Sequence, residues 1–352
     1  MMNNIKKMIC KSLVVCATFL AMTNSENTIK AEDNLGPRDV VQYSGNLKIA
    51  SYNVFMLSRN LYPNWGQIQR ADLISKTNFL KNNDVIIFNE AFDNVASTKL
   101  LENVKKEYPN QTPVLGRSKN GWDSTSGSYS STVFEDGGVT IVSKHPIVKK
   151  EQYVYKNGCG EDYHSNKGFI YAKIEKNGQN VHVFGTHTQA DDSSCSTGQA
   201  KNIRTSQFKE LKEYIKSKNI PKNEVVLIGG DLNVNKSHDG KYTDEYTKML
   251  KELNVNSPHY KGHTATWDPK TNSIAKFSHP NYEAEYLDYI LVDKDHAQPN
   301  NWYNNALAVP SKPWSVTAHF KKYMYRDLSD HYPVIAGTDE TLISNNNSLV
   351  IK

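Results

Sequence analysis

Short apolar runs bordered by polar side chains constrain the fold of this chain more than any other feature. Each run places an acid, an amide or a histidine at its border: residues 85–88 before Glu90, 181–184 before His187, 225–228 before Asp231 and Asn233, and 333–336 after Asp330 and His331. Apolar runs of this length predict strands buried on both faces. Because α/β proteins keep their sites at strand ends, these borders are the first candidates for a functional site.

Helical patterns lie between the strand-like runs, at residues 95–108, 200–218 and 243–253. Helices that alternate with strands predict an α/β layered domain. Two strand, helix, strand blocks are centred on Glu90 and Asp231, which suggests two related halves whose sites meet between sheets. The chain has no sequence repeat of fixed period, so the hypothesis of two related halves rests only on the order of the predicted strands and helices.

The N-terminal segment has the composition of a secretory signal peptide, which we place at residues 1–31. Lys6, Lys7 and Lys11 precede a mostly apolar stretch at 13–22. That stretch has about half of the ~20 residues that a membrane span needs, and Cys16 lacks the small residues that precede a lipid-modified cysteine. We expect a lead-in at 32–44, one catalytic domain at 45–338 and a loose tail at 339–352.

Export would leave a nearly neutral protein with two cysteines. Removing residues 1–31 takes away four lysines and one glutamate, so the formal charge falls from +5 to +2. This net charge argues against a broad nucleic-acid-binding surface but does not exclude a local basic patch. Cys159 and Cys195 remain, and in an oxidising compartment they are expected to pair, the alternative being two free thiols.

The residue types at the strand borders fit metal-assisted hydrolysis. Carboxylate and amide oxygens suit a hard cation such as Mg²⁺, and histidine suits proton transfer near neutral pH. Asp231 and Asn233 project to the same side if the chain is extended there. The preceding Gly229 and Gly230 would let the backbone approach a ligand closely.

Six ordered motifs carry a family resemblance. They are residues 51–54 (SYNV), 88–94 (FNEAFDN), 185–188 (GTHT), 229–235 (GGDLNVN), 286–290 (YLDYI) and 329–333 (SDHYP). Their order resembles the deoxyribonuclease I-like phosphodiesterase superfamily. Together with residues 62–66 (YPNWG), 262–267 (GHTATW) and Cys159, their form is similar to the secreted bacterial neutral sphingomyelinase C group, which includes the cytolytic beta-toxins. The resemblance covers residues 47–336.

The resemblance implies a four-layer α/β sandwich of two packed mixed β-sheets flanked by helices, and Mg²⁺-dependent hydrolysis of sphingomyelin to ceramide and phosphocholine. Each motif residue then has an expected role. Glu90 and Asn53 would bind the metal or orient its water; Asp231 and Asn233 would position phosphate and water; His331 would be the general base, oriented by Asp288; Asp330 would lie near the metal; and His187 would stabilise the transition state.

Two peripheral features carry further expectations. Asn94, Glu135 and Asp136 match an edge cation site of this group, although adjacent acids are ordinarily a solvated corner. Residues 313–323 predict a hairpin near the C-terminus, with Trp314, His319 and Phe320 as membrane-binding residues. Some relatives carry a Trp-Phe pair at the tip, so His319 implies weaker or pH-dependent insertion. An ordinary buried aromatic hairpin is the alternative.

We therefore expect a secreted, monomeric, membrane-damaging hydrolase. Its partner would be sphingomyelin in the outer leaflet of host membranes, reached by peripheral contact, and no nucleic acid is expected. A secreted nuclease of the same superfamily is the first alternative, and the near-neutral charge counts against it. A membrane-binding protein with a vestigial site is the second alternative, and the complete set of motif residues counts against it.

Overall fold

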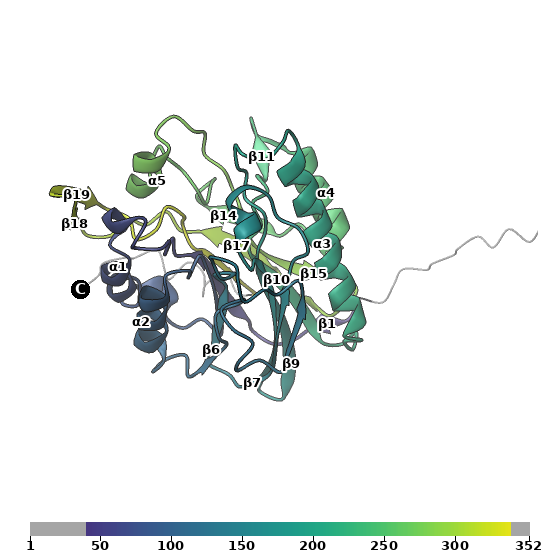
Figure 1. Cartoon of the computed structure of the whole chain (residues 1–352). Helices are drawn as coiled ribbons and strands as arrows, with labels where there is room; N and C mark the ends of the chain where they lie inside the picture. The colour runs from purple at the N-terminus through teal and green to yellow at the C-terminus, as the bar shows by residue number, and fades with distance from the viewer. Residues whose placement is uncertain (1–39, 339–352) are drawn as a thin grey trace, which may run out of the picture. The chain divides into compact units, whose positions relative to one another are not determined.

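Two seven-stranded mixed sheets form the framework of the protein (Figure 1). The computed structural model describes residues 40–338, so the predicted signal peptide at 1–31 and tail at 339–352 lie outside the described residues. In spatial order the first sheet contains β13 (Val255–Asn256), β15 (Asp288–Asp293), β10 (Val225–Asp231), β9 (Gln179–His187), β8 (Gly168–Lys176), β7 (Ile147–Val154) and β5 (Ser124–Gly127). The second contains β14 (His259–Gly262), β17 (Tyr303–Ala306), β20 (Val334–Gly337), β2 (Lys48–Asn53), β3 (Val85–Asn89), β6 (Thr140–Ser143) and β4 (Asn110–Gln111).

Helices cover the outer faces of both sheets, which confirms the predicted four-layer α/β sandwich (Figure 1). The helices are α1 (Gln67–Ile74), α2 (Asn94–Val104), α3 (Gln199–Ser217), α4 (Asp244–Leu253) and the short α5 (Ser273–Ser278). Asp93 caps α2 by accepting a hydrogen bond from the backbone N–H of Ala96, and Thr243 caps α4 in the same way through Tyr246. Such caps satisfy backbone donors that the first helical turn leaves free.

The core between the two sheets is almost entirely aliphatic. Ile87 and Ile141 from one sheet share an apolar cluster with Val183, Leu227 and Ile290 from the other, and all five are 0% exposed. Burying each such side chain contributes about 1.5–3 kcal/mol. This packing explains why the predicted strands read as continuous apolar runs, since both faces of each central strand are covered.

Gly229 and Gly230 on β10 are required by this packing. A Cβ atom on Gly230 would lie 1.8 Å from the backbone oxygen of Thr186, and one on Gly229 would lie 2.8 Å from the side chain of Ile87. Gly230 also has a φ of 137°, which favours glycine. The expectation that these glycines admit a ligand is therefore corrected: they admit the neighbouring strand and the facing sheet.

Strand pairing brings the polar borders to one end of the molecule. β2 and β3 are parallel in the second sheet, and β9 and β10 are parallel in the first. In the register of the first sheet, Asp231 lies between His187 on β9 and Asp288 on β15. Parallel strands end at the same edge, so the sheet itself gathers these side chains.

Three small pairs of strands lie outside the main sheets. β11 (Ser237–His238) pairs with β12 (Lys241–Tyr242), and β1 (Gln42–Tyr43) pairs with β16 (Gln298–Pro299). The β1 strand falls within the predicted lead-in and pairs in parallel with β16. No helix within residues 40–338 is long and apolar enough to cross a membrane.

The predicted hairpin is present as β18 (Trp314–Ala318) and β19 (Lys321–Tyr325). His319 and Phe320 form its two-residue turn, both with positive φ, and Phe320 is fully exposed. Trp314, in contrast, is 6% exposed and packs against Tyr325. The membrane-binding role expected for Trp314 is corrected, because its ring anchors the base of the hairpin in the core.

The predicted disulfide between Cys159 and Cys195 is present. It joins the 3-10 helix region at Gly160–His164 to the loop that precedes α3. Both loops border the polar end of the sheets, so the bond fixes part of the wall around the candidate site.

Candidate active site

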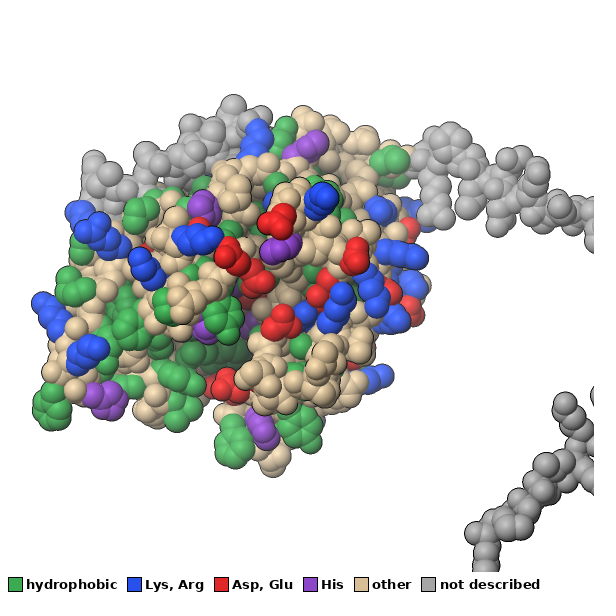
Figure 2. Space-filling model, turned by 90° about the horizontal axis from the view of Figure 1, so that it is seen from above, with side chains coloured by type: hydrophobic (Ala, Val, Ile, Leu, Met, Phe, Trp, Pro, Cys, Tyr) green, Lys and Arg blue, Asp and Glu red, His purple; other side chains and the backbone are tan. Residues whose placement is uncertain are grey.

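A cluster of acids, amides and histidines fills the space where the ends of the central strands meet. The structure brings together eight of the predicted site residues here, with Ser329 beside them: Asn53, Glu90, His187, Asp231, Asn233, Asp288, Asp330 and His331. In Figure 2, which views the molecule from above, acidic side chains and histidines gather around a hollow, with lysines and arginines mostly toward the periphery. The separate motifs of the sequence thus form one site.

Asn53 links the two carboxylates from opposite sheets. Its Nδ2 donates to Glu90 Oε1 at 2.8 Å and to Asp231 Oδ2 at 3.0 Å, while its Oδ1 accepts from the backbone N–H of Phe55. Glu90 has a φ of 55°, a conformation that costs a residue with a Cβ about 1–3 kcal/mol. The surrounding hydrogen bonds hold Glu90 in this position, so that its carboxylate turns toward Asp231.

His331 and Asp288 form a buried pair. His331 Nδ1 lies 2.8 Å from Asp288 Oδ2, and the other ring nitrogen, Nε2, lies 3.7 Å from Asp231 Oδ2. Burial lowers the pKa of His331, but the carboxylates of Asp288, Asp231 and Asp330 outweigh this and raise the pKa well above its usual value. Asp288 therefore fixes the ring and stabilises its charged form, which leaves Nε2 facing the cluster.

His187 faces Asp231 from the other side. Its Nε2 lies 3.6 Å from Asp231 Oδ2 and 3.2 Å from the Nζ of Lys167. Burial, together with the charges of Lys167 and His331, lowers the pKa of His187 well below its usual value. His187 is thus a neutral imidazole beside a fixed positive charge.

Lys167 is a site residue that the sequence analysis missed. It is 6% exposed and also forms an ion pair with Asp162 at 2.8 Å. In sequence it stands in a polar stretch just before β8, where a lysine is ordinarily exposed. The only sequence signal is its position directly before the apolar run of β8, which marks another strand border.

Asn233 and Asp330 complete the central cluster. The backbone N–H of Asn233 donates to Asp231 Oδ1 at 3.0 Å, and its side chain donates to the carbonyl of Thr188. Asn233 has a φ of 48°, so residues 231–233 turn at this point. Asp330 is buried and accepts from the hydroxyl of Ser329 at 3.3 Å.

The cluster fits a divalent cation. Ligand atoms of Glu90, Asp231 and His331 lie within 4.8 Å of one another. Burial and then the charge of Asp330 raise the pKa of Glu90 to about 7; burial and then the charge of Asp288 raise the pKa of Asp231 to about 6. Burial and neighbouring carboxylates thus disfavour the charged forms of Glu90 and Asp231, and a bound positive ion would stabilise them. Mg²⁺ commonly binds one or two carboxylates while keeping several waters.

Arg70 is a second buried cation that the sequence did not reveal. It is 0% exposed and donates only to backbone carbonyls, including those of Val54, Leu328 and Phe55. Burial lowers the pKa of Arg70 to about 10. Its guanidinium ties the β2 border to the loop before His331, so it holds two site segments together.

The predicted edge residues form a separate group. Asn94, Glu135 and Asp136 line a common cavity of about 250 Å³, together with Arg117. Arg117 Nε donates to Asp136 Oδ2 at 2.7 Å. Burial and then the charge of Asp136 raise the pKa of Glu135 to about 7, and burial raises the pKa of Asp136 to about 6. Cation binding at this edge stays a prediction.

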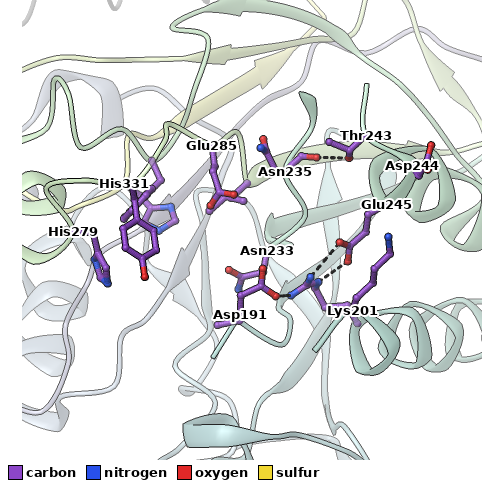
Figure 3. Close-up of a pocket in the computed structure, with 15 residues that line it drawn as sticks. Asp191, Lys201, Asn233, Asn235, Thr243, Asp244, Glu245, His279, Glu285 and His331 are labelled. Atoms are coloured by element: carbon purple, nitrogen blue, oxygen red, sulfur yellow. Dashed lines mark hydrogen bonds and ion pairs between the residues drawn. The ribbon is translucent and has the colours of Figure 1, made fainter. Parts of the chain in front are cut away.

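Two cavities open from the central cluster in different directions. One, of about 380 Å³, reaches Glu90 and His187 and is lined largely by apolar side chains such as Leu57, Leu61, Phe92 and Phe134. The other, of about 590 Å³, reaches Asn233 and His331 and is lined mainly by polar and charged side chains (Figure 3). The central cluster thus borders one largely apolar cavity and one mainly polar cavity.

Comparison with known proteins gives a consistent assignment. Residues 50–331 match the Endonuclease/Exonuclease/phosphatase family. The chain is similar to phospholipase C from Staphylococcus aureus, at 57% identity over 95% of this chain and 97% of that protein. It is also similar to sphingomyelinase C from Bacillus cereus, at 59% identity over 82% of this chain and 88% of that protein.

Solved structures extend this similarity to the fold. A variant of beta toxin from Staphylococcus aureus, determined with bound magnesium ions, superposes with a TM-score of 0.82 at 61% identity and covers 84% of this chain and 100% of its own. A family protein from Bacteroides thetaiotaomicron superposes with a TM-score of 0.55 at 16% identity, which shows the fold alone.

Proposed function

This chain belongs to the endonuclease/exonuclease/phosphatase family, and we propose that it is a magnesium-dependent sphingomyelin phosphodiesterase that releases ceramide and phosphocholine. The observation that carries this proposal is the central cluster, in which a histidine paired with an aspartate faces two convergent carboxylates. The cluster supplies a base, a cation site and phosphate-positioning groups, the parts that phosphodiester hydrolysis needs. The sphingomyelinase C relatives supply the substrate.

His331 is the general base in this proposal. A cation held by Glu90 and Asp231 would offset the carboxylates that raise the pKa of His331 and so favour its neutral form. Neutral His331 then removes a proton from the attacking water through Nε2, while Asp288 holds the ring through Nδ1 and stabilises the imidazolium that forms. The water oxygen forms a bond to phosphorus, and the bond to the ceramide oxygen breaks on the opposite side. Asp231 lies between His331, on the side of the attacking water, and His187, on the side of the leaving group.

His187 and Lys167 act on the leaving side. The positive charge of Lys167 stabilises negative charge that develops as the ceramide oxygen departs, and the neutral imidazole of His187 can donate a hydrogen bond to it. The departing oxygen takes a proton from solvent, and His331 returns to solvent the proton it removed from water, which completes the hydrolysis. Asn53 and Asn233 orient the carboxylates and the phosphate rather than exchange protons.

Glu90 and Asp231 would hold the magnesium ion, with Asp330 close to its waters. When bound, Mg²⁺ neutralises the phosphate oxygens and offsets the repulsion among the carboxylates. The magnesium-containing beta toxin structure supports this choice of metal.

We further infer export and peripheral membrane contact as a monomer. The composition of residues 1–31 supports secretion, and the exposed Phe320 between His319 and Lys321 supports contact with a lipid surface. The protein would then damage host membranes by converting sphingomyelin in their outer leaflet, as the similarity to a beta toxin suggests.

A three-substrate assay tests the proposed function. Purified protein is incubated with Mg²⁺ and vesicles of sphingomyelin, vesicles of phosphatidylcholine, or plasmid DNA. We expect phosphocholine release from sphingomyelin that a chelator stops and added Mg²⁺ restores. Nicking of plasmid DNA without sphingomyelin turnover would favour a nuclease and overturn the proposal.

A further inference from the structure

Three aromatic rings form one wall of the polar cavity beside His331. Trp267 and His279 have ring centroids 5.5 Å apart, His279 and Tyr282 are 5.0 Å apart, and Trp267 and Tyr282 are 6.2 Å apart. Their planes meet at 63° to 83°, so the rings contact one another edge to face and form one aromatic group. All three residues line the cavity that reaches His331.

A half-buried carboxylate lies in the same cavity. Backbone hydrogen bonds with Trp267 fix the position of Glu285, yet its side chain makes no hydrogen bond or ion pair with any residue between 40 and 338. Burial and then the charge of Asp191 raise the pKa of Glu285. A carboxylate left in this state gains from a cation that enters the cavity.

The positive side chains of the cavity do not neutralise Glu285. Arg204 forms ion pairs with Glu245 and Asp191, both at 2.7 Å. In Figure 3, Glu245 lies across the cavity from His279. Lys201 is exposed at the same far side. Arg204 and His331 act on Glu285 only through space, so the carboxylate beside the three rings has no direct cationic partner within residues 40–338.

The backbone ties this region to the proposed base. Trp267 pairs with Glu285 and with His331 in isolated β-bridges. Trp267 thus lies beside the histidine that would activate water, in a cavity that adjoins the apolar cavity of Glu90 and His187 at Ala190.

We propose that Trp267, His279, Tyr282 and Glu285 form the subsite for the trimethylammonium group of the substrate. The inference rests on the proposed function and extends it to headgroup recognition. A quaternary ammonium ion cannot donate hydrogen bonds, so aromatic faces and one unpaired carboxylate are the groups that recognise it. The apolar part of the substrate then occupies the adjoining apolar cavity, where Leu61, Phe92 and Phe134 lie.

The test compares two soluble phosphodiesters with the same leaving group, p-nitrophenyl phosphocholine and methyl p-nitrophenyl phosphate. The ratio of their kcat/KM values measures recognition of the trimethylammonium group and is independent of the chemistry that both share. We expect Glu285→Gln and Tyr282→Ala each to lower this ratio about tenfold, mostly through KM for the choline ester.

Glu283→Gln is the matched control. It removes the same charge two residues away, but Glu283 is exposed and pairs with Lys270 outside the cavity. Its ratio should equal that of the unsubstituted protein. If Glu285→Gln leaves the ratio unchanged, or if both esters lose activity equally, the proposed subsite is wrong.

Sphingomyelin turnover by the unsubstituted protein separates this inference from the proposed function. Turnover with an unchanged ratio in both variants would reject the subsite and leave the phosphodiesterase intact. If sphingomyelin is not cleaved, binding of tetramethylammonium, followed by NMR shifts of the protein, decides the subsite independently. Binding that Glu285→Gln weakens would support it, and no binding would reject it.

Discussion

The central cluster around Glu90 and Asp231 and the edge group of Asn94, Glu135 and Asp136 both contain acids and an asparagine. They differ in whether a basic side chain pairs directly with one of the acids. At the edge, Arg117 lies 2.7 Å from Asp136 and neutralises part of the acidic charge. In the centre, Glu90 and Asp231 accept hydrogen bonds from the amide of Asn53, and Asp231 also accepts one from the backbone N–H of Asn233. Neither carboxylate pairs directly with a lysine or arginine among residues 40–338; the nearest charged partner is His331, whose Nε2 lies 3.7 Å from Asp231. Acidic residues at a strand border therefore do not define a metal site by themselves.

The difference predicts unequal dependence on magnesium. An arginine fixed by Ala91, Phe92 and Ser97 supplies positive charge to the edge at all times. Among residues 40–338, no lysine or arginine pairs directly with Glu90 or Asp231, since the nearby Lys167 pairs with Asp162, so these two carboxylates gain more from an ion supplied by solution. Four measurements follow from this comparison.

The largest expected effect is loss of the base. His331→Ala should lower sphingomyelin turnover by about 10²- to 10⁴-fold, because the attacking water loses its proton acceptor. Turnover is measured as phosphocholine release, and vesicle binding by cosedimentation should be nearly unchanged. Turnover that survives in a folded variant would exclude His331 as the base.

Glu90→Gln should show that activity depends on magnesium at the central cluster more than at the edge group. The neutral side chain keeps the hydrogen-bonding shape but removes a magnesium ligand, so the Mg²⁺ concentration for half-maximal activity should rise about 100-fold. Magnesium titrations of activity provide the measurement. Glu135→Gln at the edge is the control, and an equal shift there would remove the proposed distinction.

The pH dependence of stability should reveal both groups in metal-free protein. Glu90 and Glu135 have pKa values raised to about 7, and Asp231 and Asp136 to about 6. A raised pKa means that the folded state binds the proton more tightly, so this contribution is present at low pH and is lost as pH rises through 6 to 7.

Metal-free protein should therefore lose unfolding free energy between about pH 5 and about pH 8, on the order of 1–3 kcal/mol for each carboxylate before solvent screening. Urea unfolding at the two pH values measures this. Mg²⁺ should reduce the loss, and Glu90→Gln should reduce the effect of Mg²⁺. A stability that rises over this pH range would contradict the raised pKa values.

The smallest effect is expected at the edge. Glu135→Gln should change turnover less than tenfold at saturating Mg²⁺, because Arg117 continues to pair with Asp136. The assay is run on vesicles and on p-nitrophenyl phosphocholine in parallel. A loss as large as that of Glu90→Gln would show that the edge acids contribute directly to the reaction.

Much of the fold and the central site could be predicted from sequence because strand borders leave a local signal. The apolar runs indicated β3, β9, β10 and β20, and the polar residue at each border pointed to Glu90, His187, Asp231 and His331. Lys167, Arg70 and Glu285 could not be found in this way. Their importance depends on burial and on partners far along the chain, and neither property appears in the neighbouring residues.

At Trp314 and Gly230 the sequence allowed two interpretations, and only the packing in the structure distinguished them. An aromatic residue in a hairpin fits a membrane surface or a core equally well, and only packing against Tyr325 decided for the core. A glycine beside a site fits close approach of a ligand or of a strand, and the contact with Thr186 decided for the strand.

The sequence by itself determined the residue types of the chemistry and the α/β pattern that carries them, because both are local properties of short segments. Tertiary structure decided which acid acquires a counter-charge and which cavity receives each end of a substrate. These properties depend on distance and desolvation between segments from different strands, as the contrast between Asp136 beside Arg117 and the unpaired Glu285 shows.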